Sequence, residues 1–233
     1  MFYVACLLLS PLIALLSVYL RLTTIKLPEA SGVREGIIGD GGSFNILYLG
    51  DSAAAGVGVE HLDNALVGKL NRKLSIKYKV HWHLIANNGD RTQDAINKLE
   101  NLSACKLDIT IVSLGVNEVT SGCSLTKWRK STHQLIKQLR NKFGCSNILL
   151  TCVPPMASFP ALHWPLNWLL GWRAEQLNKE LARICSEHAY IHFLTPSFDD
   201  NRNGFAVDGF HPNEVGYEIW AQAALEVINS LYT

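Results

Sequence analysis

The chain has 233 residues, of which 21 are basic and 20 are acidic, so its net charge is close to zero. This balance does not favour a nucleic acid or another polyanion as a partner. The six cysteines include no Cys-x-x-Cys pair, which argues against a structural zinc site, and we expect no metal or cofactor.

The amino-terminal stretch is apolar. Residues 2–20 carry no charge over 19 positions, about the length of a helix that crosses a membrane. We expect residues 1–21 to be an uncleaved membrane anchor, with the membrane as a partner. Arg21, Lys26 and Arg34 follow this stretch, which favours a cytoplasmic-facing domain. The alternative is a cleaved signal segment, which would leave the protein periplasmic or secreted.

Two further parts follow this stretch. Residues 22–43 are rich in glycine and are expected to form a linker. Residues 44–233 are enough for one α/β domain with a sizeable core. The sequence indicates no oligomeric state.

An apolar run over residues 46–49 ends abruptly in Gly50-Asp51-Ser52. Such a run is typical of a buried strand in a parallel sheet, and glycine permits a sharp turn at its end. Open α/β sheets bind their ligands at that end, so Ser52 is a candidate nucleophile. The alternative is an ordinary turn in which Ser52 is the N-cap of a helix.

Helical and strand-like patterns alternate through the rest of the chain. The spacing of apolar residues predicts helices over about 62–74, 92–102, 125–143 and 172–188, and a last helix that ends near residue 231. Strands are predicted over about 78–86, 107–114, 147–153 and 190–194. Cys152, in the third of these strands, is expected to be a small buried apolar side chain. The alternation predicts a flavodoxin-like three-layer α/β/α sandwich with a parallel sheet of about five strands.

Polar loops follow three of these strands and precede the last helix. The strand-end loops are Gly50-Asp51-Ser52, Asn88-Gly89-Asp90 and Gly115-Val116-Asn117-Glu118, and a parallel sheet brings them to one edge. The fourth loop, residues 207–213, contains Asp208 and His211. A carboxylate three residues before a histidine can orient that ring, whose other nitrogen is then free to accept the proton of a serine.

These four blocks resemble those of the SGNH hydrolases, also called the GDSL esterase/lipase family. The blocks read GDSAAAGVGV, NNGDRTQDA, GVNE and DGFHPNEVGY, in the order of the family. The resemblance covers about residues 45–225 and implies that Ser52 is the nucleophile, His211 the base and Asp208 its partner. It also implies an oxyanion hole formed by Ser52, Gly89 and Asn117.

One position departs from the family pattern. The family often has Asp after the oxyanion-hole Asn, and here that residue is Glu118. We expect it to support the loop and to take no part in the chemistry. Asp51, beside the nucleophile, is expected to stabilise the turn through hydrogen bonds to nearby backbone.

The stretch from Met156 to Trp172 is rich in Phe, Leu and Trp and is expected to be a long loop, because Pro160 and Pro165 interrupt a helix. It is either a small satellite core, or an apolar wall for an acyl chain or a membrane-touching lip. In the second case the substrate-binding candidates are Phe159, Leu162, Trp164 and Trp168.

The sequence therefore predicts a serine esterase or lipase that hydrolyses small-molecule or lipid acyl esters through an acyl-enzyme. The enzymatic alternatives are a carbohydrate O-acetyl esterase and a lysophospholipase or thioesterase. The non-enzymatic alternative is a membrane-tethered lipid-binding module.

Overall fold

A six-stranded sheet forms the centre of the protein in its computed structural model, which describes residues 2–197 and 202–232. The strand order is β1-β3-β2-β4-β5-β6. The strands are β1 Glu35–Ile38, β2 Gly42–Gly50, β3 Tyr78–Ala86, β4 Ile109–Ser113, β5 Asn147–Thr151 and β6 Ile191–Leu194. Strands β2 to β6 are parallel, and β1 pairs antiparallel with β3 at the edge. The predicted parallel sheet of about five strands is confirmed, with one antiparallel strand added.

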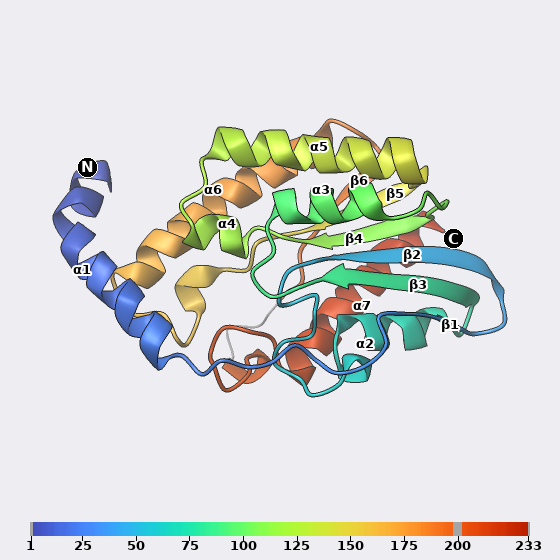
Figure 1. The fold of residues 1–233 in the computed structure, drawn as a ribbon, viewed down its shortest axis with the longest axis horizontal. Helices are drawn as coiled ribbons and strands as arrows, with labels where there is room; N and C mark the ends of the chain where they lie inside the picture. The colour runs from blue at the N-terminus through green and yellow to red at the C-terminus, as the bar shows by residue number, and fades with distance from the viewer. Residues whose placement is uncertain (1, 198–201, 233) are drawn as a thin grey trace.

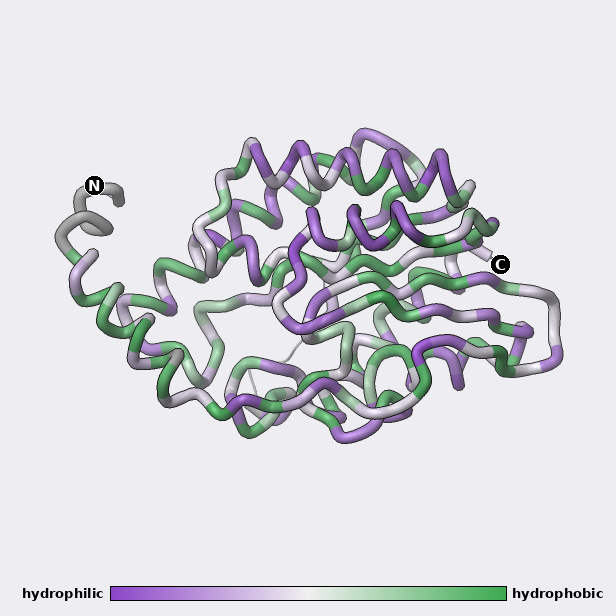
Figure 2. The backbone as a smooth tube through the Cα atoms, viewed as in Figure 1, coloured by the Kyte–Doolittle hydropathy of each residue, from purple (hydrophilic) through white to green (hydrophobic). Residues whose placement is uncertain are grey.

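Helices cover both faces of this sheet (Figure 1). One face packs on α3 Thr92–Asn101, α5 Leu125–Phe143 and α6 Leu166–Ser186, and the other on α2 Leu66–Leu74 and α7 Glu214–Leu231. Alternation along β2 explains the two cores: Leu47 and Leu49 face the first layer, and Ile46 and Tyr48 the second. Figure 2 shows hydrophilic residues alternating with hydrophobic ones along α3 and α5, as expected of helices with one solvated face. The three-layer α/β/α prediction is confirmed.

The remaining helices are shorter or lie outside these layers. They are α1 Phe2–Thr23, α4 Val116–Thr120 and the 3₁₀ turns η1 Leu62–Asn64, η2 Met156–Ser158 and η3 Arg202–Gly204. The helix predicted over 62–74 is divided into η1 and α2, because Ala65 between them is extended.

Helix α6 begins at Leu166, six residues before the predicted start at Trp172. The prediction was wrong because Pro165 was read as interrupting a helix, whereas it is the N-cap residue of α6. A proline at the start of a helix removes no intrahelical hydrogen bond. Much of the expected loop from Met156 to Trp172 is therefore helical.

The amino-terminal part differs from the prediction in two ways. Within the stretch expected to be a linker, residues 35–38 form β1 and pair with β3. Helix α1 lies against α6 (Figure 1), where Ile13, Leu16 and Leu20 pack on the core. Of the helices in the described residues, none is long and apolar enough to span a membrane. The anchor predicted for residues 1–21 stays a prediction.

Candidate active site

Ser52 lies in the turn that follows the central strand β2. Glycine is required at Gly50, since a Cβ atom there would lie 2.5 Å from the Cβ of Ala54 and 2.7 Å from the carbonyl oxygen of Ser113. The chain can therefore turn closely over the neighbouring strand β4. Residues 52–58 form turns and no α-helix, so the alternative of Ser52 as a helix N-cap is wrong.

His211 connects Ser52 to Asp208. Its Nε2 lies 2.9 Å from Ser52 Oγ, and its Nδ1 lies 2.6 Å from Asp208 Oδ2. The other carboxylate oxygen of Asp208 accepts hydrogen bonds from the backbone N–H groups of Phe210 and His211, at 3.0 and 3.1 Å. The backbone of this loop thus holds the carboxylate in place, and the carboxylate in turn orients the imidazole ring. The structure brings together the three residues predicted as nucleophile, base and partner.

Asp208 is suited to remain ionised, although it is buried. Burial by itself raises the pKa of a carboxyl group, but the hydrogen bonds from His211 and from the two backbone N–H groups outweigh it and lower the pKa of Asp208. An ionised Asp208 accepts a hydrogen bond from Nδ1–H of His211, which leaves Nε2 as the acceptor for the hydroxyl proton of Ser52. This arrangement can remove a proton from Ser52 and later return it to a leaving group.

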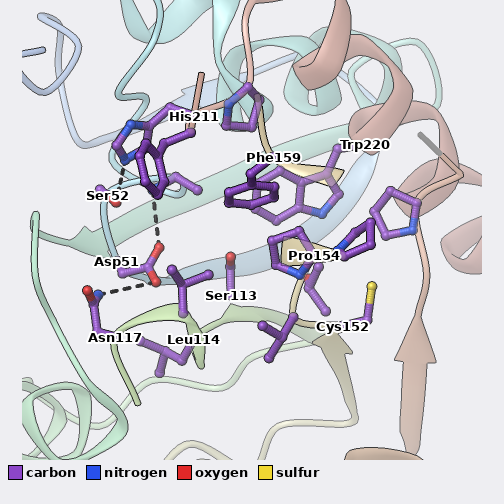
Figure 3. Close-up of a pocket in the computed structure, with 18 of the residues that line it drawn as sticks. Asp51, Ser52, Ser113, Leu114, Asn117, Cys152, Pro154, Phe159, His211 and Trp220 are labelled. Carbon is purple, nitrogen blue, oxygen red and sulfur yellow. Dashed lines mark hydrogen bonds between the residues drawn. The ribbon is translucent and has the colours of Figure 1, made fainter. Parts of the chain in front are cut away.

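Asn117, in the short helix α4, lies on the wall of the same pocket as Ser52. Its Nδ2 donates to the carbonyl oxygen of Asp90 at 2.9 Å and lies 3.5 Å from Oδ2 of Asp51 (Figure 3). Gly89 has a positive φ of 86°, and a Cβ there would meet nothing within 4 Å. Asn88, the residue before it, lines the pocket. The role of Gly89 as an oxyanion donor therefore stays a prediction.

Asp51 is almost fully buried beside the nucleophile. Its Oδ1 accepts a hydrogen bond from the backbone N–H of Ala53 at 3.1 Å, so its predicted place in the turn is confirmed. The pKa of Asp51 is raised to about 7, first by burial and then by the nearby carboxylates of Glu118 and Asp90, which together outweigh the lowering effects of the Ala53 hydrogen bond and of His211.

A pocket of about 350 Å³ opens beside Ser52 and extends along the carboxyl ends of β4 and β5 (Figure 3). Its wall is mostly apolar and includes Leu114, Val153, Pro154, Phe159, Phe205 and Trp220. Phe159 packs edge-to-face on Phe205 and Phe210, with ring centroids 5.3 and 5.8 Å apart. This aromatic group joins the segment after β5 to the loop that carries His211.

Of the four predicted substrate-binding residues, only Phe159 lines this pocket. Leu162 is buried in the core, where it packs with the layer that contains α6. Trp164 and Trp168 are 64% and 36% exposed and lie outside the pocket. Apolar composition does not specify the direction in which a side chain points, so substrate contact by Leu162, Trp164 and Trp168 stays a prediction.

Most of the residues that line the pocket were not predicted as site residues, among them Cys152, Phe210 and Trp220. Cys152 was expected to be a simple core residue but lines the pocket, and burial raises the pKa of its thiol to about 11. Phe210 directly precedes His211, so its position in the sequence could have indicated that it lies at the site. Trp220 lies two turns into α7, and no local pattern pointed to it.

The described residues contain no group of three or more His, Cys, Asp or Glu side chains that could hold a metal ion.

Comparisons with known proteins identify the family and the fold. Residues 48–219 match the sequence profile of the GDSL-like Lipase/Acylhydrolase family. A search of curated proteins finds no match.

Solved structures share the fold at low sequence identity. A member of the lipolytic protein G-D-S-L family from Veillonella parvula is 20% identical, with a TM-score of 0.66 over 80% of this chain and 98% of that chain. The psychrotrophic esterase EstA from Pseudoalteromonas sp. is 18% identical, with a TM-score of 0.61 over 81% and 98%. A Clostridium thermocellum family 3 carbohydrate esterase is 16% identical, with a TM-score of 0.60 over 81% and 98%.

Proposed function

Because the chain belongs to the GDSL-like lipase/acylhydrolase family, we propose that it hydrolyses carboxylic acyl esters through an acyl-enzyme formed on Ser52. The observation that carries this proposal is the continuous hydrogen-bonded series from Asp208 through His211 to Ser52, at 2.6 and 2.9 Å, on the wall of an apolar pocket.

The reaction begins when Ser52 Oγ attacks the carbonyl carbon of the ester and its proton moves to Nε2 of His211. The carbonyl oxygen becomes an oxyanion, which Asn117 Nδ2–H and the backbone N–H groups of Ser52 and Gly89 stabilise. The C–O bond to the alcohol then breaks, and His211 returns the proton to the departing oxygen. A water molecule then gives a proton to His211 and attacks the acyl carbon. The bond from that carbon to Ser52 Oγ breaks, His211 returns the proton to Ser52, and the carboxylic acid is released.

The pocket favours an acyl ester with an apolar acyl group over an acetylated carbohydrate. An alkyl chain that packs on Phe159, Phe205 and Trp220 is stabilised, because its methylene groups are removed from water. A site for a sugar would instead need several polar groups that converge on hydroxyls. Lysophospholipids and thioesters remain within the proposed class, because both present an acyl carbonyl beside an alkyl chain.

An activity-based fluorophosphonate probe, which phosphonylates activated serines, tests the proposal. The wild-type protein is expected to be labelled, and Ser52→Ala and His211→Ala are expected not to be. Ser103→Ala removes an exposed serine that lies outside the four sequence blocks and does not line the pocket, and it serves as the matched control. Failure to label the wild-type protein would reject the hydrolase and favour a lipid-binding module. Labelling of Ser52→Ala would place the nucleophile elsewhere.

A further inference from the structure

We propose that Cys152 and Trp220 form the inner end of the acyl-binding pocket and set the longest acyl chain that the enzyme accepts. This inference rests on the proposed function and specifies its substrate class.

The topology separates Cys152 from the nucleophile by two strand spacings. Ser52 follows β2 and Cys152 follows β5, and β4 lies between these two strands. Neighbouring strands lie about 4.8 Å apart, so the two strand ends are about 10 Å apart. Figure 3 shows Cys152 and Trp220 across the pocket from Ser52, with Phe159 and Pro154 between them. A chain attached to Ser52 would therefore run along the edge of the sheet.

The acyl group, and not the alcohol, suits this pocket. The acyl half stays bonded to Ser52 after the first step, whereas the alcohol must leave past His211. The side chain of His211 is 23% exposed, which gives the alcohol and the incoming water a route to solvent. The lining of the pocket also includes Pro196 and Trp220, which are buried and offer no such route.

The inner end is also rigid. The backbone N–H of Cys152 donates to the carbonyl oxygen of Leu194 at 2.9 Å. The side chain of Asn178 then pairs with both the N–H and the C=O of Val153, each at 2.8 Å. These bonds hold the start of the segment after β5, so an acyl chain that is too long cannot easily displace it. A rigid end predicts a sharp limit on chain length.

The chemistry of Cys152 fits contact with an alkyl chain. Burial raises the pKa of its thiol to about 11, so the group is neutral near pH 7 and behaves as a small apolar side chain. Replacing it by a larger apolar residue shortens the pocket without introducing a charge.

The experiment measures kcat/KM for p-nitrophenyl esters from acetate to palmitate. For the wild-type enzyme kcat/KM is expected to rise by up to about fourfold per methylene until the chain reaches Cys152, and then to fall. Cys152→Phe should shift this optimum to shorter chains and lower kcat/KM at the wild-type optimum by at least about tenfold, a larger loss than for the acetate ester. Cys152→Met adds a flexible side chain and should give a smaller shift in the same direction.

Cys105→Phe adds the same ring at an exposed cysteine and is expected to leave the profile unchanged. Circular dichroism shows whether each variant is folded, and Cys152→Met serves if Cys152→Phe is not. An unchanged chain-length profile in a folded Cys152 variant would overturn the inference and leave the esterase proposal intact. A wild-type protein that hydrolyses no ester and is not labelled at Ser52 would instead reject the proposed function itself.

Discussion

Oε1 of Glu118 accepts two hydrogen bonds from Thr92, one from its backbone N–H and one from its hydroxyl, both at 2.7 Å. Thr92 is the first residue of α3, and Glu118 lies in α4 next to Asn117. The carboxylate thus satisfies an N–H group that the helix itself leaves without a partner. Glu118, which departs from the family pattern, therefore joins two of the loops at the candidate site. This is the supporting role that was predicted for it from the sequence.

Glu118→Ala is expected to lower the free energy of unfolding by about 2–4 kcal/mol, because it leaves the buried N–H and hydroxyl of Thr92 unpaired. It should also lower kcat, since Asn117 adjoins the lost contact. Chemical denaturation followed by circular dichroism measures the first effect. Glu100→Ala, on the exposed side of α3, is the control, and equal stabilities for the two variants would contradict the assigned role.

The local chemistry of the site could be predicted because it depends on short stretches of chain. The turn at Ser52 needs only a buried strand and a glycine, and the spacing of Asp208 and His211 lets one loop place both groups. Each strand-end loop then reaches the same edge, because a parallel sheet aligns the carboxyl ends of its strands.

The pocket could not be predicted, because it depends on contacts between distant segments. Phe159 meets Phe205 and Phe210 only after the segment following β5 packs on the loop before α7. The sequence shows that a side chain is apolar, but it does not show whether that side chain becomes buried or stays exposed. Trp164 and Phe159 therefore looked alike in sequence, although one is exposed and the other is buried.

Asn117→Ala is expected to lower kcat by about 10²–10³-fold with little change in KM, because it removes a donor to the oxyanion that forms only in the transition state. Steady-state kinetics on a short-chain p-nitrophenyl ester separate the two constants. Asn101→Ala, which removes an exposed amide at the end of α3, controls for loss of an asparagine. A rise in KM alone would assign Asn117 to substrate binding and remove it from the oxyanion hole.

Asp51→Asn is expected to stabilise the protein at pH 8 and to have little effect at pH 4. The folded-state pKa of Asp51 is about 7, above its ordinary value of 3.8, so the folded protein holds a proton that the unfolded chain releases. Wild-type stability therefore falls as pH rises from about 4 to 7, and the loss is at most about 4 kcal/mol. A neutral asparagine avoids this loss and keeps the oxygen that accepts from Ala53.

Melting temperatures of wild-type and variant proteins between pH 4 and 8 measure this difference. The exposed Asp40 gives the control Asp40→Asn, which makes the same substitution at a solvated position. A constant difference for Asp51→Asn across the range would show that Asp51 is ionised in the folded protein well below pH 7.

Gly58→Ala is expected to impair both stability and turnover, because Gly58 is where the nucleophile turn meets the histidine loop. Its φ is +109°, and a Cβ there would lie 2.1 Å from the carbonyl oxygen of Pro212, next to His211. We expect a loss of at least about 1 kcal/mol in unfolding free energy from the backbone conformation alone.

Gly42→Ala is the matched control, since a Cβ at Gly42 meets nothing within 4 Å. If Gly58→Ala loses stability but keeps the wild-type kcat, the backbone contact with Pro212 does not position His211. A kcat that falls by at least about tenfold in protein that is still folded would mean that the nucleophile turn and the base loop hold each other in register.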